Sequence, residues 1–152
     1  MKEVSNDLEK ARNIYGKLYY EHKNVIVQLK SILLDKNLPV VLWGAGLKGL
    51  AFIDLFDPVA EWIDYIIDQD TKKQGNQLFS GHVIKGAEQL DKNSIILIAN
   101  KNYYSSVCFD LIRYGFDIKY MKLICLDQVM DGSLLLSDIQ NGTAWIRRKY
   151  YD

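Results

Sequence analysis

Residues 40–52 read VVLWGAGLKGLAF, and this stretch decides the fold class. A wholly apolar run, residues 40–43, precedes three glycines spaced as G-x-G-x-x-G, and an apolar segment with helical spacing follows them. A strand, a glycine turn and a helix in this order are typical of the first unit of a dinucleotide-binding α/β domain. The question is whether this turn binds a phosphate or only bends the chain.

Each glycine has a separate role if a phosphate binds at the turn. Gly44 permits the tight turn, Gly46 leaves the backbone open to the phosphate, and Gly49 lets the helix lie close to the strand. Amide N–H groups at the helix start would then point at the anion, and the helix dipole and Lys48 would add to the attraction. The predicted cofactor-binding segment is Gly44, Ala45, Gly46, Leu47, Lys48 and Gly49.

An acidic residue after the next strand completes the dinucleotide pattern. Residues 62–67 are rich in branched and aromatic side chains, which favours a strand, and Asp68 follows them. Its carboxylate could accept hydrogen bonds from both ribose hydroxyls, with Asp70 as an alternative. It would repel a 2′-phosphate, so we expect NAD or a plain nucleoside rather than NADP, although Lys72 and Lys73 counteract that repulsion. In the competing interpretation the glycines only allow close packing and Asp68 caps a loop.

The remaining pattern predicts a three-layer α/β sandwich with a mainly parallel, Rossmann-like sheet. Helical segments are expected over 47–56, 87–90 and 103–114, and strands over 82–84, 94–99 and within 118–126. We divide this single domain into an N-terminal helix (1–38), a nucleotide-binding core (39–130) and a C-terminal extension (131–152). In the extension, Asn141-Gly142 separates two strand-like runs, and this dipeptide predicts a hairpin.

Residues after the strand at 94–99 are further candidates for the site, because ligands of open parallel sheets bind beyond the carboxyl ends of the strands. Asn100 and Lys101 could contact a ribose or a diphosphate. Asn102 could instead cap the helix that follows.

The N-terminal segment predicts one long helix over residues 6–36, with Asn6 as its N-cap. Its apolar positions recur in steps of three and four, which forms a seam along one face. The seam could pack on the protein's own core or form a homodimer. His22 lies on it as a packed, hydrogen-bonded residue. The seam consists of Leu8, Ala11, Tyr15, Leu18, His22, Val25, Leu29 and Ile32.

Composition and missing motifs exclude several classes of function. The 19 basic and 19 acidic side chains give a net charge of zero, which argues against a nucleic-acid partner. We find no signal peptide and no apolar run that could span a membrane, so we expect a cytoplasmic protein without a membrane partner. No metal-ligand spacing, P-loop or Ser-His-Asp set is visible, and His82 has no catalytic partner in the sequence. The catalytic residues, if any, stay unknown.

A longer series of short motifs resembles a known pattern. The turn at residues 44–49 is followed by Asp68, by Lys73-Gln74-Gly75, by Ser80-Gly81-His82-Val83-Ile84 and by Glu88-Gln89-Leu90. This order, over roughly residues 25–115, is similar to the C-terminal Rossmann-like domain of bacterial sugar C-methyltransferases. It also resembles the N-terminal domains of sugar O-acyltransferases and other surface-polysaccharide biosynthesis enzymes.

The resemblance implies a domain that holds a nucleotide-linked sugar or a related nucleotide, while the chemistry sits on other domains. The sequence contains no methyl-donor or acyltransferase domain. We therefore expect a nucleotide or nucleotide-sugar binding module, accessory to carbohydrate metabolism, whose cofactor is NAD or a nucleotide-sugar; S-adenosylmethionine stays open. The alternatives are a non-catalytic interaction protein that dimerises through the N-terminal helix, and a small NAD-dependent oxidoreductase.

Overall fold

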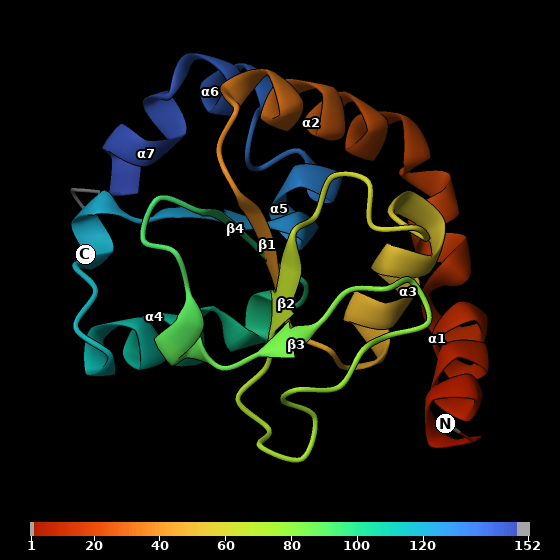
Figure 1. Ribbon diagram of the computed structural model, residues 1–152. Helices are drawn as coiled ribbons and strands as arrows, with labels where there is room; N and C mark the ends of the chain where they lie inside the picture. Colours follow the sequence, from red (N-terminus) through yellow and green to blue (C-terminus); the bar gives the residue numbers. More distant parts are fainter. Residues whose placement is uncertain (1, 149–152) are drawn as a thin grey trace.

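Five parallel strands form a single sheet in the order β3-β2-β1-β4-β5 (Figure 1). The computed structural model describes residues 2–148, with side chains described for residues 6–145. The strands are β1 (Val40–Trp43), β2 (Tyr65–Ile67), β3 (Ile84–Lys85), β4 (Ile95–Ile98) and β5 (Lys122–Cys125). The expected three-layer α/β sandwich with a parallel sheet is confirmed.

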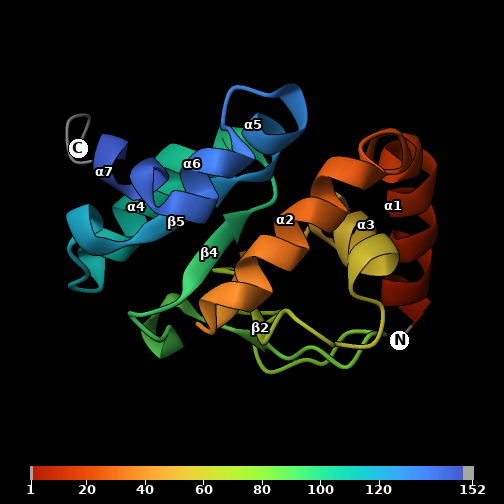
Figure 2. The ribbon, with the colours of Figure 1, turned by 90° about the horizontal axis from the view of Figure 1, so that it is seen from above.

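Helices cover both faces of the sheet. The α-helices are α1 (Lys2–Glu21), α2 (Lys23–Lys36), α3 (Leu47–Phe56), α4 (Tyr104–Arg113), α5 (Leu126–Asp131), α6 (Leu136–Asn141) and α7 (Thr143–Arg148). Short 3₁₀ turns are η1 (Ala87–Gln89), η2 (Lys101–Tyr103) and η3 (Ile118–Tyr120). Figure 1 shows α4 on the opposite side of the sheet from α2, and α1 lies beside α3 in both Figure 1 and Figure 2. No helix within residues 2–148 has the length and apolar character needed to cross a membrane.

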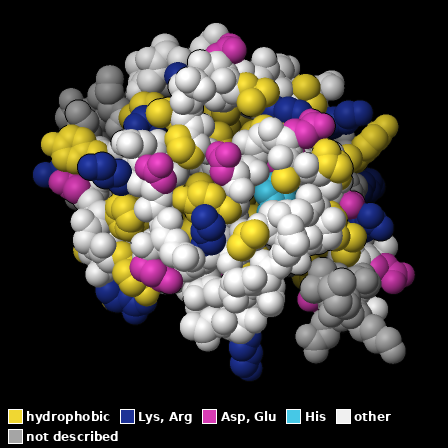
Figure 3. Space-filling model, viewed as in Figure 1, with side chains coloured by type: hydrophobic (Ala, Val, Ile, Leu, Met, Phe, Trp, Pro, Cys, Tyr) yellow, Lys and Arg dark blue, Asp and Glu magenta, His cyan; other side chains and the backbone are white. Residues whose placement is uncertain are grey.

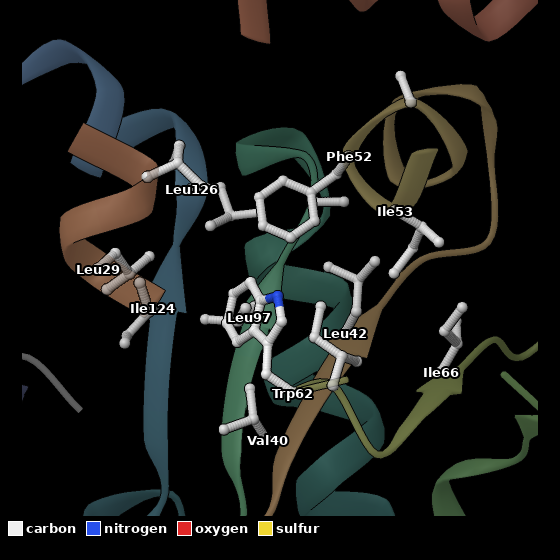
Figure 4. Close-up of a cluster of buried hydrophobic side chains, with 14 of the residues drawn as sticks. Leu29, Val40, Leu42, Phe52, Ile53, Trp62, Ile66, Leu97, Ile124 and Leu126 are labelled. Carbon is white, nitrogen blue, oxygen red and sulfur yellow. The ribbon is translucent and has the colours of Figure 1, made fainter. Parts of the chain in front are cut away.

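The four residues of β1 supply both halves of the core. Val40 and Leu42 point to one face and pack with side chains of the N-terminal helices and α3, whereas Val41 and Trp43 point to the other face and pack beneath α4. All four are buried, which is why the strand has no polar position. Figure 4 shows the first cluster, in which Phe52 of α3 and the Trp62 ring lie beside Leu42 and Leu97 of the sheet.

The prediction of one unbroken N-terminal helix is wrong. Two helices, α1 and α2, meet at His22, whose ring Nδ1 lies 2.9 Å from the Leu18 carbonyl oxygen and donates to it. Figure 2 shows the change of direction between them. The predicted N-cap at Asn6 is also wrong, because α1 begins at Lys2. The break lets α1 follow α3 while α2 crosses the sheet, so that each helix buries its own apolar stripe.

Burial along these helices favours packing on the protein's own core. Two residues of the predicted seam have no exposed surface, Ala11 on α1 and Leu29 on α2. Tyr19 on α1 is also fully buried. The seam is therefore at least partly internal, and the helices belong to the domain instead of forming a separate arm.

The predicted C-terminal hairpin is wrong. Asn141 ends α6, Gly142 takes a left-handed conformation with φ of 85°, and α7 begins at Thr143. The Asn141 side chain accepts a hydrogen bond from the Thr143 amide at 3.0 Å. Asn-Gly supplies the left-handed residue that ends a helix as readily as the one that turns a hairpin. Ile139 of α6 is fully buried, so tertiary packing favours the helix.

Strand register brings several loops to one edge of the sheet. Trp43, the last residue of β1, pairs with Ile67 of β2 and with Ile98 of β4, and Ile98 pairs with Cys125 of β5. The segments that follow these residues therefore meet at the carboxyl edge. Strand order reverses between β1 and β4, which is the position where ligands of doubly wound folds bind.

Candidate functional site

The glycine turn leaves the carboxyl end of β1 and starts α3. Gly44 has φ of 119°, a conformation that other residues rarely adopt, and its amide donates to the Ile67 carbonyl oxygen at 2.8 Å. A β-carbon on Gly49 would overlap the carbonyl oxygen of Gly44. These two glycines are therefore required by the turn and by the close approach of helix to strand, as the sequence predicts.

Gly46 differs from its two neighbours in the motif. It is the N-cap of α3, with φ of −79°, a value open to any residue. A β-carbon placed on it would meet no atom within 4 Å. The fold alone therefore does not require glycine here, although a ligand that approaches the backbone closely would require it.

A cavity of about 200 Å³ lies over the turn, between β1 and β4. Its lining contains most of the predicted segment, together with two tyrosines that the sequence did not single out as site residues. The lining residues are Tyr15, Gly44, Gly46, Leu47, Lys48, Gly49, Ala99, Asn100 and Tyr103.

Lys48 is held on the cavity wall by contacts from two other elements. Its ammonium forms an ion pair with Asp127 at the start of α5, and it lies 5.8 Å from the centre of the Tyr15 ring. Its backbone carbonyl accepts a hydrogen bond from the Tyr19 hydroxyl at 3.1 Å. Burial raises the pKa of the Tyr19 phenol, which therefore stays protonated and continues to donate.

The second oxygen of Asp127 fixes the loop after β4. It accepts the Lys101 amide at 2.7 Å, so one carboxylate joins α3 to the segment that contains Asn100. Lys101 itself is exposed, and its backbone rather than its side chain makes this contact.

Asp68 lies at the predicted edge but bonds to the turn itself. Its Oδ2 accepts the Ala45 amide at 2.8 Å, and its Oδ1 accepts the Asp70 amide at 2.8 Å. Ala45 faces a second cavity of about 250 Å³, which Asp70, Lys72 and Lys73 also line. The Lys73 ammonium donates to the Ala45 carbonyl at 3.3 Å. Asp68 and Ala45 thus lie toward the β2 side of the turn, away from the first cavity.

The predicted capping role of Asn102 is wrong. Asn100 is the N-cap of η2, and its side-chain oxygen accepts the Asn102 amide at 3.0 Å. Tyr103 precedes α4 without a side-chain cap. Asn100 therefore combines a structural bond with a place in the cavity wall, where its amide NH₂ keeps its donors.

Sequence reasoning missed Tyr15, Tyr103 and Asp127. Asp127 lies two residues beyond β5, so the rule about strand ends could have found it once β5 was placed. Tyr103 follows the Asn100-Lys101 candidates directly and could have been included with them. No signal could have found Tyr15, because its approach to the turn depends on how α1 packs against α3.

The structure also joins three residues that the sequence did not relate. The His82 ring lies between Asp57, with Nε2 at 2.8 Å from Oδ2, and Ser80, whose Oγ is 2.5 Å from Nδ1. The expectation that the chain has no Ser-His-Asp set is therefore wrong, because these three side chains are in contact. However, Ser80 is buried and the His82 and Asp57 side chains have no exposed surface, whereas a nucleophilic serine must reach its substrate.

The backbone contacts of Asp57 explain this buried chain. Its carboxylate accepts the amides of Glu61 at 2.6 Å and Ile63 at 2.9 Å. Burial would raise the pKa of Asp57, but the hydrogen bonds from His82 and from these amides outweigh that effect and lower it. The chain therefore holds the loop after α3 against the loop before β3, which is a structural role.

Charges of both signs are mixed on one face of the molecule. Figure 3 shows Lys and Arg side chains interspersed with Asp and Glu on the face that it views. Within the described part of the chain, no group of three or more His, Cys, Asp or Glu side chains could hold a metal ion.

No family model, curated protein or solved structure matches this sequence.

Proposed function

We propose that this protein binds a nucleotide or nucleotide-sugar, with its phosphates over the glycine turn. The observation that carries the proposal is Gly46, a glycine that neither its backbone conformation nor its surroundings require. Close approach of a phosphate to the backbone gives a physical reason for a residue without a side chain at this position.

The position of the turn supports a phosphate ligand. It lies at the switch point between β1 and β4, and α3 is a helix of 10 residues whose first amides have no intrahelical acceptor. Those amides and the helix dipole favour an anion at the cavity over Gly44 and Gly46.

The β2 side of the turn offers contacts for the rest of the ligand. Each oxygen of Asp68 accepts one backbone amide and keeps a further lone pair, so the carboxylate can still accept a ribose hydroxyl. The neighbouring Lys72 and Lys73 line the second cavity together with Asp7 and Asp70, so its wall offers both donors and acceptors with balanced charge. A ligand that spans both cavities would pass over Ala45, and NAD and nucleotide-sugars are extended enough to do so.

The direct test is ligand-dependent thermal stability. Wild-type protein is heated with NAD(H), NADP(H), S-adenosylmethionine, UDP-glucose and TDP-glucose at millimolar concentration. A ligand at one hundred times its Kd stabilises the folded state by about 2.7 kcal/mol, a rise in Tm of roughly 5–10 °C. Gly46→Val should remove that rise, because its side chain enters the space that the phosphate needs.

Two further measurements make the result decisive. Gly16→Ala, on α1 and not among the residues that line the cavity, is the control and should keep the full rise. The Tm of ligand-free Gly46→Val should fall by only about 2–4 °C, the cost of a poorer N-cap, since the site is open. If no probe raises the wild-type Tm, or if Gly46→Val responds like the wild type, the proposal is overturned.

A second candidate function is self-association, favoured by one feature of α2. Val27 and Leu34 are seven residues apart, which places them on the same helical face, and they are 49% and 54% exposed. A homodimer through this face would cover them. The double variant Val27→Lys/Leu34→Lys should then convert a dimer to a monomer in light scattering. A wild-type protein that is monomeric at 100 micromolar (about 1.8 mg/ml at 17.6 kDa) would exclude this candidate.

A further inference from the structure

Lys48 of the glycine turn forms an ion pair with Asp127. They come from α3 and α5, and their side chains are only 15% and 13% exposed. Asp127 cannot turn away easily, because its other oxygen is fixed by the Lys101 amide at 2.7 Å. The pair is therefore rigid and partly desolvated, with Lys48 on the cavity wall and Asp127 behind it.

This pairing changes the charge that a ligand meets. Lys48 is the cation in the first turn of α3, where it would attract a phosphate, but Asp127 already neutralises it. A phosphate that contacts Lys48 must share its ammonium with the fixed carboxylate of Asp127, which is already paired with it. Because screening by water is reduced there and Asp127 holds Lys48 in the ion pair, Lys48 compensates less of each additional negative charge on the ligand.

We propose that Asp127 is a positioning residue that acts through Lys48 and makes the site selective for diphosphate diesters over terminal phosphates. The inference rests on the proposed function and adds the class of ligand. A diester, as in NAD or a nucleotide-sugar, carries one negative charge on each phosphorus. A terminal phosphate carries more, since its second pKa is about 6. Asp127 therefore disfavours the binding of ligands with a terminal phosphate.

The experiment compares ligands that differ in this charge and in one added sugar, and the Asp127 variant separates the two effects because it changes only the charge term. Titration calorimetry on the full chain measures ADP against ADP-ribose and UDP against UDP-glucose. In wild-type protein the diester of each pair should bind several-fold more tightly. Asp127→Asn keeps an oxygen to accept the Lys101 amide but removes the charge. It should tighten binding of ADP or UDP by about tenfold and reduce the difference within each pair to under twofold.

A double-mutant cycle tests whether the effect passes through Lys48. Lys48→Gln should weaken binding, and Asp127→Asn added to Lys48→Gln should give clearly less than the tenfold gain seen with Lys48 present. A purely structural role for Asp127 would instead weaken all four probes together. In wild-type protein, the ¹³C signal of the Asp127 carboxyl should move when ADP-ribose or UDP-glucose binds, a readout that needs no variant.

The outcomes separate this inference from the proposed function. If wild type and variants bind none of the four probes, the proposed function fails and this inference fails with it. If wild type binds a diester but Asp127→Asn leaves the preference unchanged, or the Asp127 signal does not move on binding, nucleotide binding stands and the inference alone is overturned.

Discussion

The carbonyl oxygen of Gly44 lies so close to Gly49 that a β-carbon on residue 49 would overlap it. This contact holds α3 against the end of β1 and sets the direction of the helix start. The turn therefore depends on Gly49 for its shape, whereas Gly46, three residues earlier, faces open space. Gly49 is thus required by the fold, whereas Gly46 is explained by the proposed ligand.

The first prediction compares these two glycines. Gly49→Ala should lower the free energy of unfolding by about 2–4 kcal/mol, because the backbone on both sides of the overlap must move. Gly46→Ala should lower it by about 1 kcal/mol or less, the cost of a poorer N-cap. Urea unfolding followed by circular dichroism measures both. Equal losses would show that the contact between Gly44 and Gly49 does not control the turn.

The second prediction concerns Gly16 in α1. It lies inside the helix, and a β-carbon on it would meet no atom within 4 Å. Gly16→Ala should therefore raise the free energy of unfolding by about 0.5–1 kcal/mol, because alanine loses less conformational entropy in a helix. Urea unfolding provides the measurement, and a loss of stability would mean that another group occupies this space.

The third prediction concerns the anchor between α1 and the glycine turn. Tyr19 is fully buried, packs edge-on against Phe52 at 5.6 Å and Phe56 at 5.9 Å, and donates its hydroxyl to the Lys48 carbonyl. Tyr19→Phe should lower the free energy of unfolding by about 1 kcal/mol through the lost hydrogen bond. Tyr19→Ala should lower it by about 3–5 kcal/mol through the cavity.

Chemical denaturation of both Tyr19 variants checks the order of these effects. If Tyr19→Phe were as damaging as Tyr19→Ala, the hydroxyl rather than the ring would hold α1 in place. If neither variant changed stability, α1 would not be packed on α3 as described.

The fourth prediction is a pH dependence that Asp57 contributes. Its pKa is lowered in the folded protein from the ordinary value of 3.8, so the ionised carboxylate stabilises the fold at higher pH. That stability is fully present above the unfolded pKa and is lost as the pH falls through 3.8 toward the lower folded value. The folded protein should therefore lose stability below about pH 4, at least in part through this group.

Asp57→Asn isolates this contribution. The variant should lower the free energy of unfolding at pH 7 by about 2–4 kcal/mol, since His82 and the amides of the loop lose a charged acceptor. It should also reduce the slope of stability between pH 4 and pH 2. Urea unfolding at a series of pH values gives both quantities, and an unchanged slope would show that other carboxylates account for the acid loss.

Local patterns predicted much of the architecture. The helix at Leu47–Phe56 begins and ends where the sequence places it, because a glycine turn and Asp57-Pro58 bound it on either side. Apolar runs located β1 and β4, since strands buried on both faces have no polar positions. The predicted hairpin was wrong, because a left-handed glycine such as Gly142 can end a helix as well as turn a hairpin. The predicted continuous N-terminal helix was wrong, because an apolar repeat that runs through His22 fits two helices as well as one.

The sequence by itself determined a parallel α/β sheet, a glycine turn at the end of β1 and an acid at the end of β2. These features depend on residue types that are close together in the chain, and short-range sterics and burial decide them. Only the tertiary structure decided what surrounds the turn. Lys48 meets Asp127 across 79 residues of sequence, and His82 meets Asp57 across 25. Strand order and helix packing create such contacts, and the chemistry proposed for the site depends on them.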